Sequence, residues 1–595
     1  MDPLSFAQQQ CRLGRAAAAE ATLLAQFSQQ PQPPSASFGL ALALCNLEQD
    51  QLERAEACLG RVAADHGDSP ALLSLAIACG RRRGEGSCLA QFQGRLQPFL
   101  HQEGPALEYL QLLQEALALG PVLAWAETLL QRFPHSAAVV EALRSLAWQL
   151  ADRALLEAVA ATASPHASVT ASTTASTTAS AAEDPAALLW AARLQLLGGA
   201  AGQALAQLRA CLADASAAPA LRFQALQTLA QSLPAPELLP LLNSHRSLYS
   251  NSPDWAWSIG RQYLAAGAWA QGWPLYEQRY ASSDRAQILP PGFPLRGLEQ
   301  LQQPRALENR HVLLYGEQGI GDMLMFGSLL PELLAEAASV RLLLPPRLVE
   351  LFQSSFPTAL VASSFDGPEL EQVQLAFSLG SLGGVYRPRA SAFQGRGPHL
   401  RLEPSALLAW RQRLAGLGPG ARIGIAWRGG GSLGSRVQRS LELEQLLPIL
   451  QLPGVQWLNL QYGLDPAELE QFERRHGIRL HHFEGVGENL TATAALTAAL
   501  DLVITVQQTA LHIAAGLGVP AWVLVPALAE WRYGLEGPSM PWYQSVELFR
   551  QQERGVWQSV IEAMAERLGV WLVGHNGAIN FSGPWPEPDS DGDRP

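Results

Sequence analysis

Short apolar runs alternate with helical stretches in the second half of the chain, and this alternation constrains the fold more than any other sequence feature. It is typical of parallel sheets, because each return to a parallel strand needs a crossover, usually a helix. The runs form two sets, one before and one after residue 405. The pattern predicts strands at 311–315, 340–344, 358–362, 373–379, 422–427, 455–461, 479–483, 501–506 and 521–526.

The two sets of strands predict two lobes, each built on its own doubly wound sheet. We place the first lobe at 305–405 and the second at 406–570. Ligands of such sheets bind beyond the carboxyl ends of the strands, and a cleft between lobes is a common binding place. The loops that follow the strands are therefore where we look for a site.

The first half of the chain is predicted to be α-helical, because apolar residues recur every three or four positions through 1–161 and 184–290. Segment 39–71 is typical of a tetratricopeptide unit, in which small residues let two helices pack closely. Segment 253–280 is a clearer unit of the same kind, broken by Gly267. The whole chain is then α plus α/β: a tetratricopeptide-like α-solenoid followed by the two-lobed domain.

Two segments are predicted to lie outside the folded parts. Residues 162–183 are low-complexity Ala, Ser and Thr without an apolar period, which predicts a flexible linker. Residues 571–595 are rich in Pro, Gly and Asp, which predicts a disordered tail.

Composition narrows the function. The net charge of −12 excludes a broad nucleic-acid-binding face, which needs clustered basic residues. No apolar run reaches the ~18 residues of a membrane span, and the N-terminus lacks the apolar core of a secretory signal. The six cysteines show no CxxC spacing, so we expect no zinc site and reduced thiols in a cytoplasmic protein. The chain has no Lys, so a side-chain cation on a phosphate must be Arg or protonated His.

The first candidate site is GEQGIGD at 316–322, which follows a predicted strand and opens a helix. Gly316, Gly319 and Gly321 allow a tight turn and the close approach of a ligand. Asp322 falls near the helix N-terminus, where its carboxylate would be placed to act as a base towards an acceptor hydroxyl. A plain N-cap role explains the position of Asp322 equally well, and the spacing does not separate the two roles.

The second candidate site is RGGGSLGSRVQRS at 428–440, directly after the strand at 422–427. Its glycines offer backbone N–H groups and its arginines offer two-pronged hydrogen bonds, which together suit a diphosphate. Arg428, Arg436 and Arg439 are the predicted ligands. A solvated surface loop has a similar composition, so that alternative stays open.

The third candidate site is VQQTALHIAAGLG at 506–518, where a strand passes into a helix. The backbone N–H groups of Gln507, Gln508 and Thr509 would point at an anion bound to the helix N-terminus. His512 lies one turn further, on the face that carries Gln508. A lone His on an apolar helix is more often a core residue than a ligand, but its place after a strand's carboxyl end favours the ligand.

The order of these segments, with GWPLYEQRY at 272–280 and EWRYG and PWYQSVELFRQ at 530–551, resembles a family of bacterial proteins. In that family tetratricopeptide repeats are fused to a GT-B glycosyltransferase domain. The domain is similar to the heptosyltransferases and, more remotely, to the O-linked N-acetylglucosamine transferases. The resemblance covers 253–565.

The resemblance assigns roles to individual residues. The family's Gly-Asp pair falls on Gly321 and Asp322, which implies an acceptor base. Its helix His falls on His512, which implies a second catalytic residue, and the glycine that follows falls on Gly516, which implies a contact with the donor. The chain departs from the family where Gln507 and Gln508 stand in place of Asp-Thr, which puts the donor contacts in doubt.

Heptosyltransferases also place a Lys on the donor phosphates. This chain has none, so an Arg from the 428–440 loop would have to substitute.

The resemblance implies transfer of a sugar from a nucleotide-diphosphate sugar to a glycan or protein acceptor. The nucleotide would sit on the second lobe and the acceptor would enter near Asp322. No Asp-x-Asp motif is visible in the lobes, so we expect neither a metal nor another cofactor. The helices would recruit the acceptor or protein partners. The alternative is a scaffold that has lost catalysis and works through its repeats, which Gln507 and Gln508 favour slightly.

Overall fold

The computed structural model describes residues 2–12, 15–27, 35–49, 51–83, 88–163, 184–283, 295–303, 305–365 and 370–578. Most of the predicted linker and of the predicted tail, at 164–183 and 579–595, lies outside these residues, and both stay predictions. Residues 571–578, which the sequence pattern assigned to the tail, belong to helix α30 (Gln558–Ala578), where Trp571 packs edge-on against Trp522.

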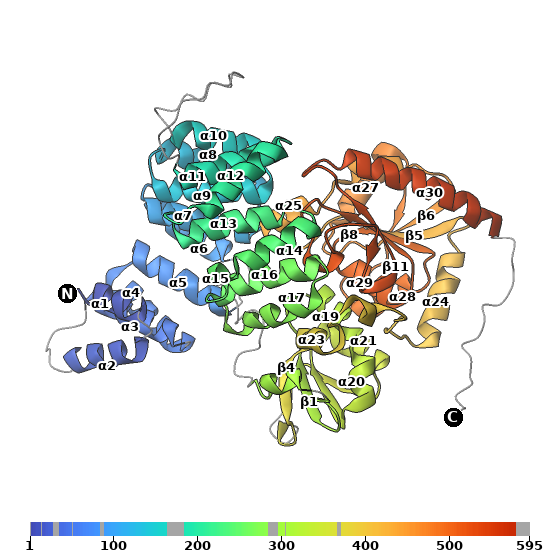
Figure 1. The fold of residues 1–595 in the computed structure, drawn as a ribbon, viewed down its shortest axis with the longest axis horizontal. Helices are drawn as coiled ribbons and strands as arrows, with labels where there is room; N and C mark the ends of the chain where they lie inside the picture. The colour runs from blue at the N-terminus through green and yellow to red at the C-terminus, as the bar shows by residue number, and fades with distance from the viewer. Residues whose placement is uncertain are drawn as a thin grey trace. The chain divides into compact units, whose positions relative to one another are not determined.

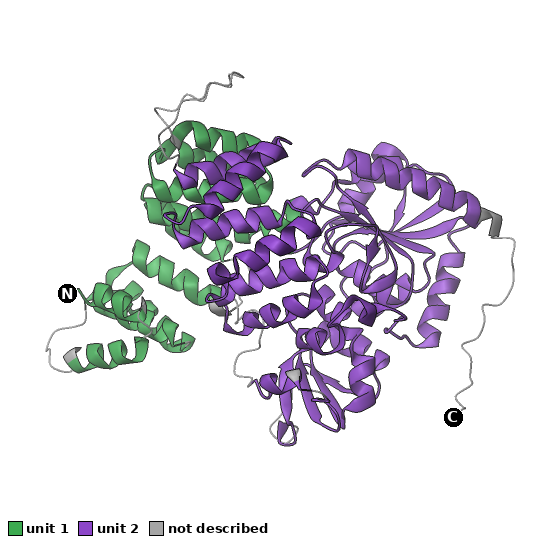
Figure 2. Ribbon diagram, viewed as in Figure 1, with its two compact units in different colours: residues 1–179, 431–437 green, residues 180–430, 438–595 purple. Residues whose placement is uncertain are grey.

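The chain divides into two compact units (Figure 2). The first comprises residues 1–179 and 431–437, and the second comprises residues 180–430 and 438–595. The second unit therefore joins the later helices to both predicted lobes.

The first unit is helical throughout its described residues. Its helices are α1 (Pro3–Arg12), α2 (Ala16–Phe27), α3 (Ala36–Glu48), α4 (Leu52–His66), α5 (Pro70–Arg83), α6 (Leu89–Leu96), α7 (Glu103–Glu115), α8 (Leu119–Arg132), α9 (Ala137–Leu150) and α10 (Arg153–Ala163). Ser136 caps α9 by accepting a hydrogen bond from the Val139 N–H at 3.2 Å. The tetratricopeptide assignment stays a prediction.

The second unit opens with further helices (Figure 1). These are α11 (Pro185–Leu197), α12 (Ala201–Ala213), α13 (Pro219–Ala230), α14 (Ala235–Ser244), α15 (Arg246–Tyr249), α16 (Pro253–Ala265) and α17 (Trp269–Tyr276). Helices α16 and α17 pack closely because Gly260 has no side chain: an added Cβ would lie 2.8 Å from the Tyr276 nitrogen.

A four-stranded parallel sheet follows, in the order β3-β2-β1-β4. Its strands are β1 (His311–Tyr315), β2 (Ser339–Leu343), β3 (Leu360–Ala362) and β4 (Leu375–Ser378), so every strand predicted for the first lobe is confirmed with small changes at its ends. The helices α19 (Ile320–Gly327), α20 (Leu330–Glu336), α21 (Pro346–Ser355) and α23 (Leu382–Tyr386) accompany it.

The second sheet has seven strands in the order β10-β11-β9-β8-β5-β6-β7. The predicted strands appear as β5 (Ala421–Ala426), β6 (Val455–Asn459), β7 (Leu480–His481), β8 (Leu502–Val506) and β9 (Ala521–Val525), all parallel. The sequence pattern missed β10 (Ser539–Met540) and β11 (Tyr543–Arg550), in which apolar and polar residues alternate. Helices α24 (Pro404–Ala415), α25 (Leu433–Gln438), α26 (Leu447–Leu450), α27 (Pro466–His476), α28 (Leu490–Thr497), α29 (Thr509–Gly516) and α30 complete the element order.

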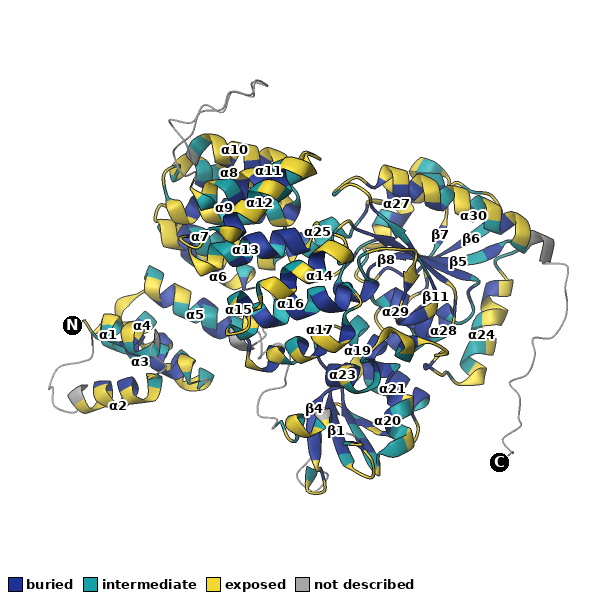
Figure 3. Cartoon of the chain, in the orientation of Figure 1, coloured by how far each residue is buried: buried dark blue, intermediate teal, exposed yellow. Residues whose placement is uncertain are grey.

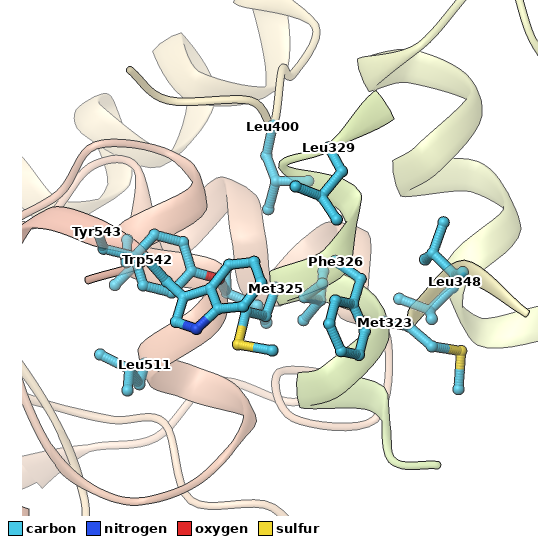
Figure 4. Close-up of a cluster of buried hydrophobic side chains, with 14 of the residues drawn as sticks. Met323, Met325, Phe326, Leu329, Leu348, Leu400, Leu511, Trp542 and Tyr543 are labelled. Carbon is cyan, nitrogen blue, oxygen red and sulfur yellow. The ribbon is translucent and has the colours of Figure 1, made fainter. Parts of the chain in front are cut away.

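One apolar core joins the helices, the first sheet and one face of the second sheet. Figure 4 shows part of it: Met325 of α19 lies beside Trp542, and Met323 lies on the other side of the helix, beside Leu348. A separate core fills the other face of the second sheet beneath α30 (Figure 3). Because the first core is continuous, α17 and the two lobes hold one another in place.

Candidate functional site

The second sheet changes winding direction between β5 and β8. The chain runs outward from β5 to β6 and β7, then returns to β8 and winds the other way to β9 and β11. The loops that leave β5 and β8 therefore diverge, and this crevice is where doubly wound sheets bind ligands. Two predicted segments, 428–440 and 506–518, begin at this switch point.

Three buried nitrogen atoms at this switch point have no hydrogen-bond partner among the residues that the structure describes. They are Trp427 Nε1, at the end of β5, and Gln507 Nε2 and Gln508 Nε2, at the end of β8. Trp427 and Gln507 are 0% and 2% exposed. An unpaired buried donor costs about 1–3 kcal/mol, so each of these three groups is a candidate to meet a hydrogen-bond acceptor from a ligand.

The loop after β5 is shaped by a residue that the sequence did not flag. Gln461 follows β6, and its Oε1 accepts hydrogen bonds from the backbone N–H groups of Trp427 and Arg428 at 3.0 and 2.8 Å. This contact turns the loop away from the sheet just where the strand ends, so these two N–H groups are not available to a ligand.

The three predicted arginines have different surroundings. Arg428 donates to both oxygens of Glu468 at 2.7 and 2.8 Å, so its charge is already paired. Arg439 lies across its own loop and donates from Nε to the Gly430 carbonyl at 3.0 Å. Arg436 lies in α25 and belongs to the first compact unit, whereas Arg428 and Arg439 belong to the second.

The segment after β8 forms the helix that the sequence predicts. Gln508 is the N-cap of α29 and Thr509 is its first residue, and the Gln508 side chain makes no capping hydrogen bond. Gly516 ends α29, and its carbonyl accepts from the His399 and Leu400 N–H groups, both at 2.9 Å. A Cβ on Gly516 would lie 2.7 Å from Leu400, so this glycine serves the packing of the lobe connector.

The first sheet has its own switch point, between β1 and β4, and there the chain fills it. Glu317 follows β1 and accepts from the Gly380 N–H beyond β4 at 2.7 Å. Arg279, at the end of the helical segment, donates to Glu317 from Nε at 2.8 Å and from Nη2 at 3.0 Å. Both side chains are 0% exposed, so this crevice is sealed.

The predicted turn at 316–322 is present. A Cβ on Gly316 would lie 2.6 Å from Met323 Sδ, and Gly319 caps α19. Asp322 occupies the third helical position, and its Oδ2 accepts from the Gly319 N–H at 3.2 Å. Asp322 is therefore not the N-cap itself, but its carboxylate takes part in capping α19, and its role as a base stays a prediction.

Asp322 also forms an ion pair with Arg532, which follows β9 in the second lobe. The capping contact uses one of its oxygens and the ion pair uses the other.

His512 and Gly321 are brought together from different lobes. An added Cβ on Gly321 would lie 2.8 Å from His512 Cδ2, so the glycine makes room for the ring. His512 Nδ1 lies 3.2 Å from Tyr543 Oη. Burial, helped by Arg532, holds the pKa of His512 well below its usual value, so the ring is neutral at pH 7.

Arg532 belongs to a chain of charges that the sequence analysis did not single out. Its Nη1 lies 3.9 Å from Glu530 Oε2, and Arg439 Nη1 lies 3.8 Å from Glu530 Oε1. Burial acts to raise the pKa of Glu530, but Arg532 and Arg439 outweigh it, so that pKa lies below its usual value. The string Asp322–Arg532–Glu530–Arg439 thus links the first lobe to the Arg- and Gly-rich loop. Charged residues in the EWRYG segment were the available signal.

Neither a metal-binding cluster nor a membrane-spanning helix is present among the described residues. No group of three or more His, Cys, Asp or Glu side chains is placed to hold a metal ion. No described helix is both long and apolar enough to cross a membrane.

Comparison with known proteins gives a partial match. The sequence matches no protein-family profile. It is 30% identical over 325 residues to protein FlbA of Caulobacter vibrioides, a match that covers 51% of this chain and 53% of FlbA. The chain thus spans about half the length of the curated relative it matches.

Two solved structures also match. A glycosyl transferase family 9 protein from Veillonella parvula aligns with a TM-score of 0.32 at 9% identity, over 45% of this chain and 97% of that one. The ADP-heptose lipopolysaccharide heptosyltransferase II of E. coli aligns with a TM-score of 0.31 at 14% identity, over 45% and 99%. At these scores the likeness establishes neither a shared fold nor a shared activity.

Proposed function

We propose that this chain is a glycosyltransferase that moves a sugar from a nucleotide-diphosphate sugar to a glycan or protein acceptor. The observation that carries the proposal is the set of buried, unpartnered donors at the switch point of the second sheet, Trp427 Nε1, Gln507 Nε2 and Gln508 Nε2. A nucleotide sugar is rich in hydrogen-bond acceptors, and it would satisfy donors that the protein leaves unpaired.

The diphosphate would lie near the N-terminus of α29, where the N–H groups of Gln508 and Thr509 and the helix dipole favour an anion. Two cations support this placement, because Arg439 and Arg532 lie 3.8 and 3.9 Å from the two oxygens of Glu530. They would offset the charge that grows on the leaving diphosphate, so the transfer needs no metal ion.

Asp322 would act on the acceptor. Its carboxylate would take the proton of the acceptor hydroxyl while the hydroxyl oxygen bonds to the anomeric carbon of the sugar. The bond from that carbon to the diphosphate oxygen breaks, and its electron pair leaves on the diphosphate. His512 is buried and neutral, so it would position Gly321 and Tyr543 rather than donate a proton.

The helices of the second unit would recruit the acceptor or a partner protein. Helices α13 and α16 enclose a hollow of about 360 Å³. It is lined by aromatic and polar side chains, including Phe223, Gln224, Gln227, Trp255, Ser258 and Arg261. A hollow with both aromatic and polar side chains can bind a peptide through apolar contacts and hydrogen bonds together.

The test is incubation with labelled nucleotide sugars and mixed acceptor fractions, comparing wild type with Asp322→Asn. Turnover should fall by roughly 10²–10⁴-fold, the usual contribution of a general base. Asp184→Asn is the matched control, because Asp184 also caps a helix through its carboxylate and lies at the start of α11, in the helical segment before the two sheets. An Asp322→Asn protein with full turnover would exclude the role of Asp322, and a wild type without transfer would favour the scaffold alternative.

A further inference from the structure

Arg532 is a cation that contacts both halves of the proposed site. It follows β9 in the second lobe, is 9% exposed, pairs with Asp322 of the first lobe and lies 3.9 Å from Glu530. Its Nε is buried and has no hydrogen-bond partner among the described residues. A guanidinium has five donors in a fixed fork, so Arg532 keeps capacity for another acceptor while it holds Asp322.

Each carboxylate oxygen of Asp322 already accepts one hydrogen bond. Oδ1 is held by Arg532 and Oδ2 accepts from the Gly319 N–H at 3.2 Å. A proton taken from an acceptor hydroxyl would neutralise the carboxylate and give up its charge-assisted hydrogen bond to Arg532, so the ion pair opposes that transfer. The structure therefore holds the proposed base in a form that is not ready for catalysis.

We propose that Arg532 is the cation that binds the donor diphosphate, and that it leaves Asp322 to do so. The proposal rests on the proposed function, because it needs a diphosphate at the second sheet. The anion takes over the guanidinium, and Asp322 Oδ1 becomes free to accept the acceptor's proton. The donor must then bind before the acceptor can react. Arg532 does in this Lys-free chain what an ammonium group would otherwise do.

This arrangement predicts that removing a carboxylate from the site raises its affinity for diphosphate. Asp322 and the diphosphate compete for the same guanidinium, so removing the Asp322 charge should strengthen diphosphate binding. A merely structural ion pair between the lobes predicts the reverse, since its loss would loosen the site and weaken binding or leave it unchanged. The sign of one affinity change separates the two.

The experiment is calorimetric titration of the full chain with inorganic pyrophosphate and, separately, with UDP, ADP and GDP. Asp322→Asn should bind pyrophosphate roughly tenfold more tightly than wild type, the scale of one charge-assisted hydrogen bond. Arg532→Gln should bind it at least about tenfold less tightly. The double variant should bind as weakly as Arg532→Gln, because Asp322 has then no cation to withhold.

Two matched controls should leave the affinity unchanged. Asp184→Asn removes the capping carboxylate of α11, and Arg475→Gln removes another ion-paired Arg, one that lies 2.7 Å from Glu444. If wild type binds pyrophosphate and Asp322→Asn binds it no more tightly, the exchange at Arg532 is wrong. The proposed function would still stand in that case. If wild type and Asp322→Asn are both folded and neither binds any of the four probes, both the exchange and the proposed function are wrong.

Discussion

The two sheets of this protein have the same kind of switch point and treat it in opposite ways. In the first sheet, Glu317 spans the crevice between β1 and β4 and Arg279 closes it from the helical side. In the second sheet, Trp427 at the end of β5 and Gln507 at the end of β8 each have a buried side-chain nitrogen. Neither nitrogen has a hydrogen-bond partner among the described residues. A topological switch point marks where a ligand can bind, and the site exists only where the chain leaves it unfilled.

The difference follows from what lies next to each sheet. The helical segment ends in Arg279, which reaches Glu317, Ser381 and the hydroxyl of Tyr280 at 2.8–3.1 Å. Trp273 of α17 also donates to the Arg387 carbonyl at 2.8 Å. The helices therefore complete the first lobe as a structural element, while the unpaired groups of the second lobe are those of the proposed donor site.

The largest effect should come from breaking the filled switch point. Arg279→Met leaves the Glu317 carboxylate buried without its cation, and this should cost about 3–5 kcal/mol of unfolding free energy. Urea denaturation followed by tryptophan fluorescence measures it. Arg475→Met, at an exposed ion pair, is the control and should cost less than about 1 kcal/mol.

A double variant sharpens this prediction. Arg279→Met with Glu317→Met removes the stranded charge as well, so it should be more stable than Arg279→Met alone. A double variant that is less stable than the single one would mean that Glu317 does not depend on Arg279.

Acid should weaken the contact between the lobes, where two buried histidines lie. Burial lowers the pKa of His399 to about 4, against about 6.5 in the unfolded chain. The unfolded state therefore binds the proton first, and stability that is complete above pH 6.5 is lost as the pH falls from 6.5 through 4. The loss should reach about 3 kcal/mol for His399, measured as melting temperature against pH.

His399→Gln isolates this effect. The variant should show a flatter decline between pH 6.5 and 4, because its side chain does not titrate. Glu317 acts with the opposite sign, since burial raises its pKa despite Arg279, and its contribution is common to both proteins. An unchanged slope in the variant would show that His399 is not the group that titrates.

The smallest effect should appear at the open switch point, with the opposite sign for stability. Gln507→Met replaces a buried unpaired amide with an apolar side chain of similar length, so the free protein should gain about 1 kcal/mol. Nucleoside-diphosphate binding should weaken by roughly 3–10-fold, the value of one neutral hydrogen bond. Thermal melting and titration calorimetry on the same sample give both numbers. A Gln507→Met protein that loses stability would mean that this amide is satisfied in the folded chain.

Much of the fold was predictable from the sequence, because most of the parallel strands lie within short, mainly apolar runs. The run at 521–526, found as β9, is buried at every position from Ala521 to Val525. Strand β11 was missed because only part of it is buried and its polar residues break the run. The tetratricopeptide assignment and the domain limits remain predictions.

Less of the candidate site was predictable. The segment 506–518 was placed from strand-to-helix spacing, and Gly321 and His512 do meet. The pairing of Asp322 with Arg532, 210 positions apart, depends on how the two lobes pack, and no local spacing encodes it. The same holds for Arg428, which lies in a loop and forms an ion pair with Glu468 of α27.

The most direct test of the central claim is calorimetric titration of wild type and of a Gln507→Met, Gln508→Met variant with UDP, ADP, GDP and CDP. The account predicts saturable binding of at least one of them to wild type below about 1 mM, the upper range for natural substrates. It also predicts that the variant binds that nucleotide more weakly while remaining folded. Equal binding by the two proteins, or no binding of any of the four to wild type, would contradict the account.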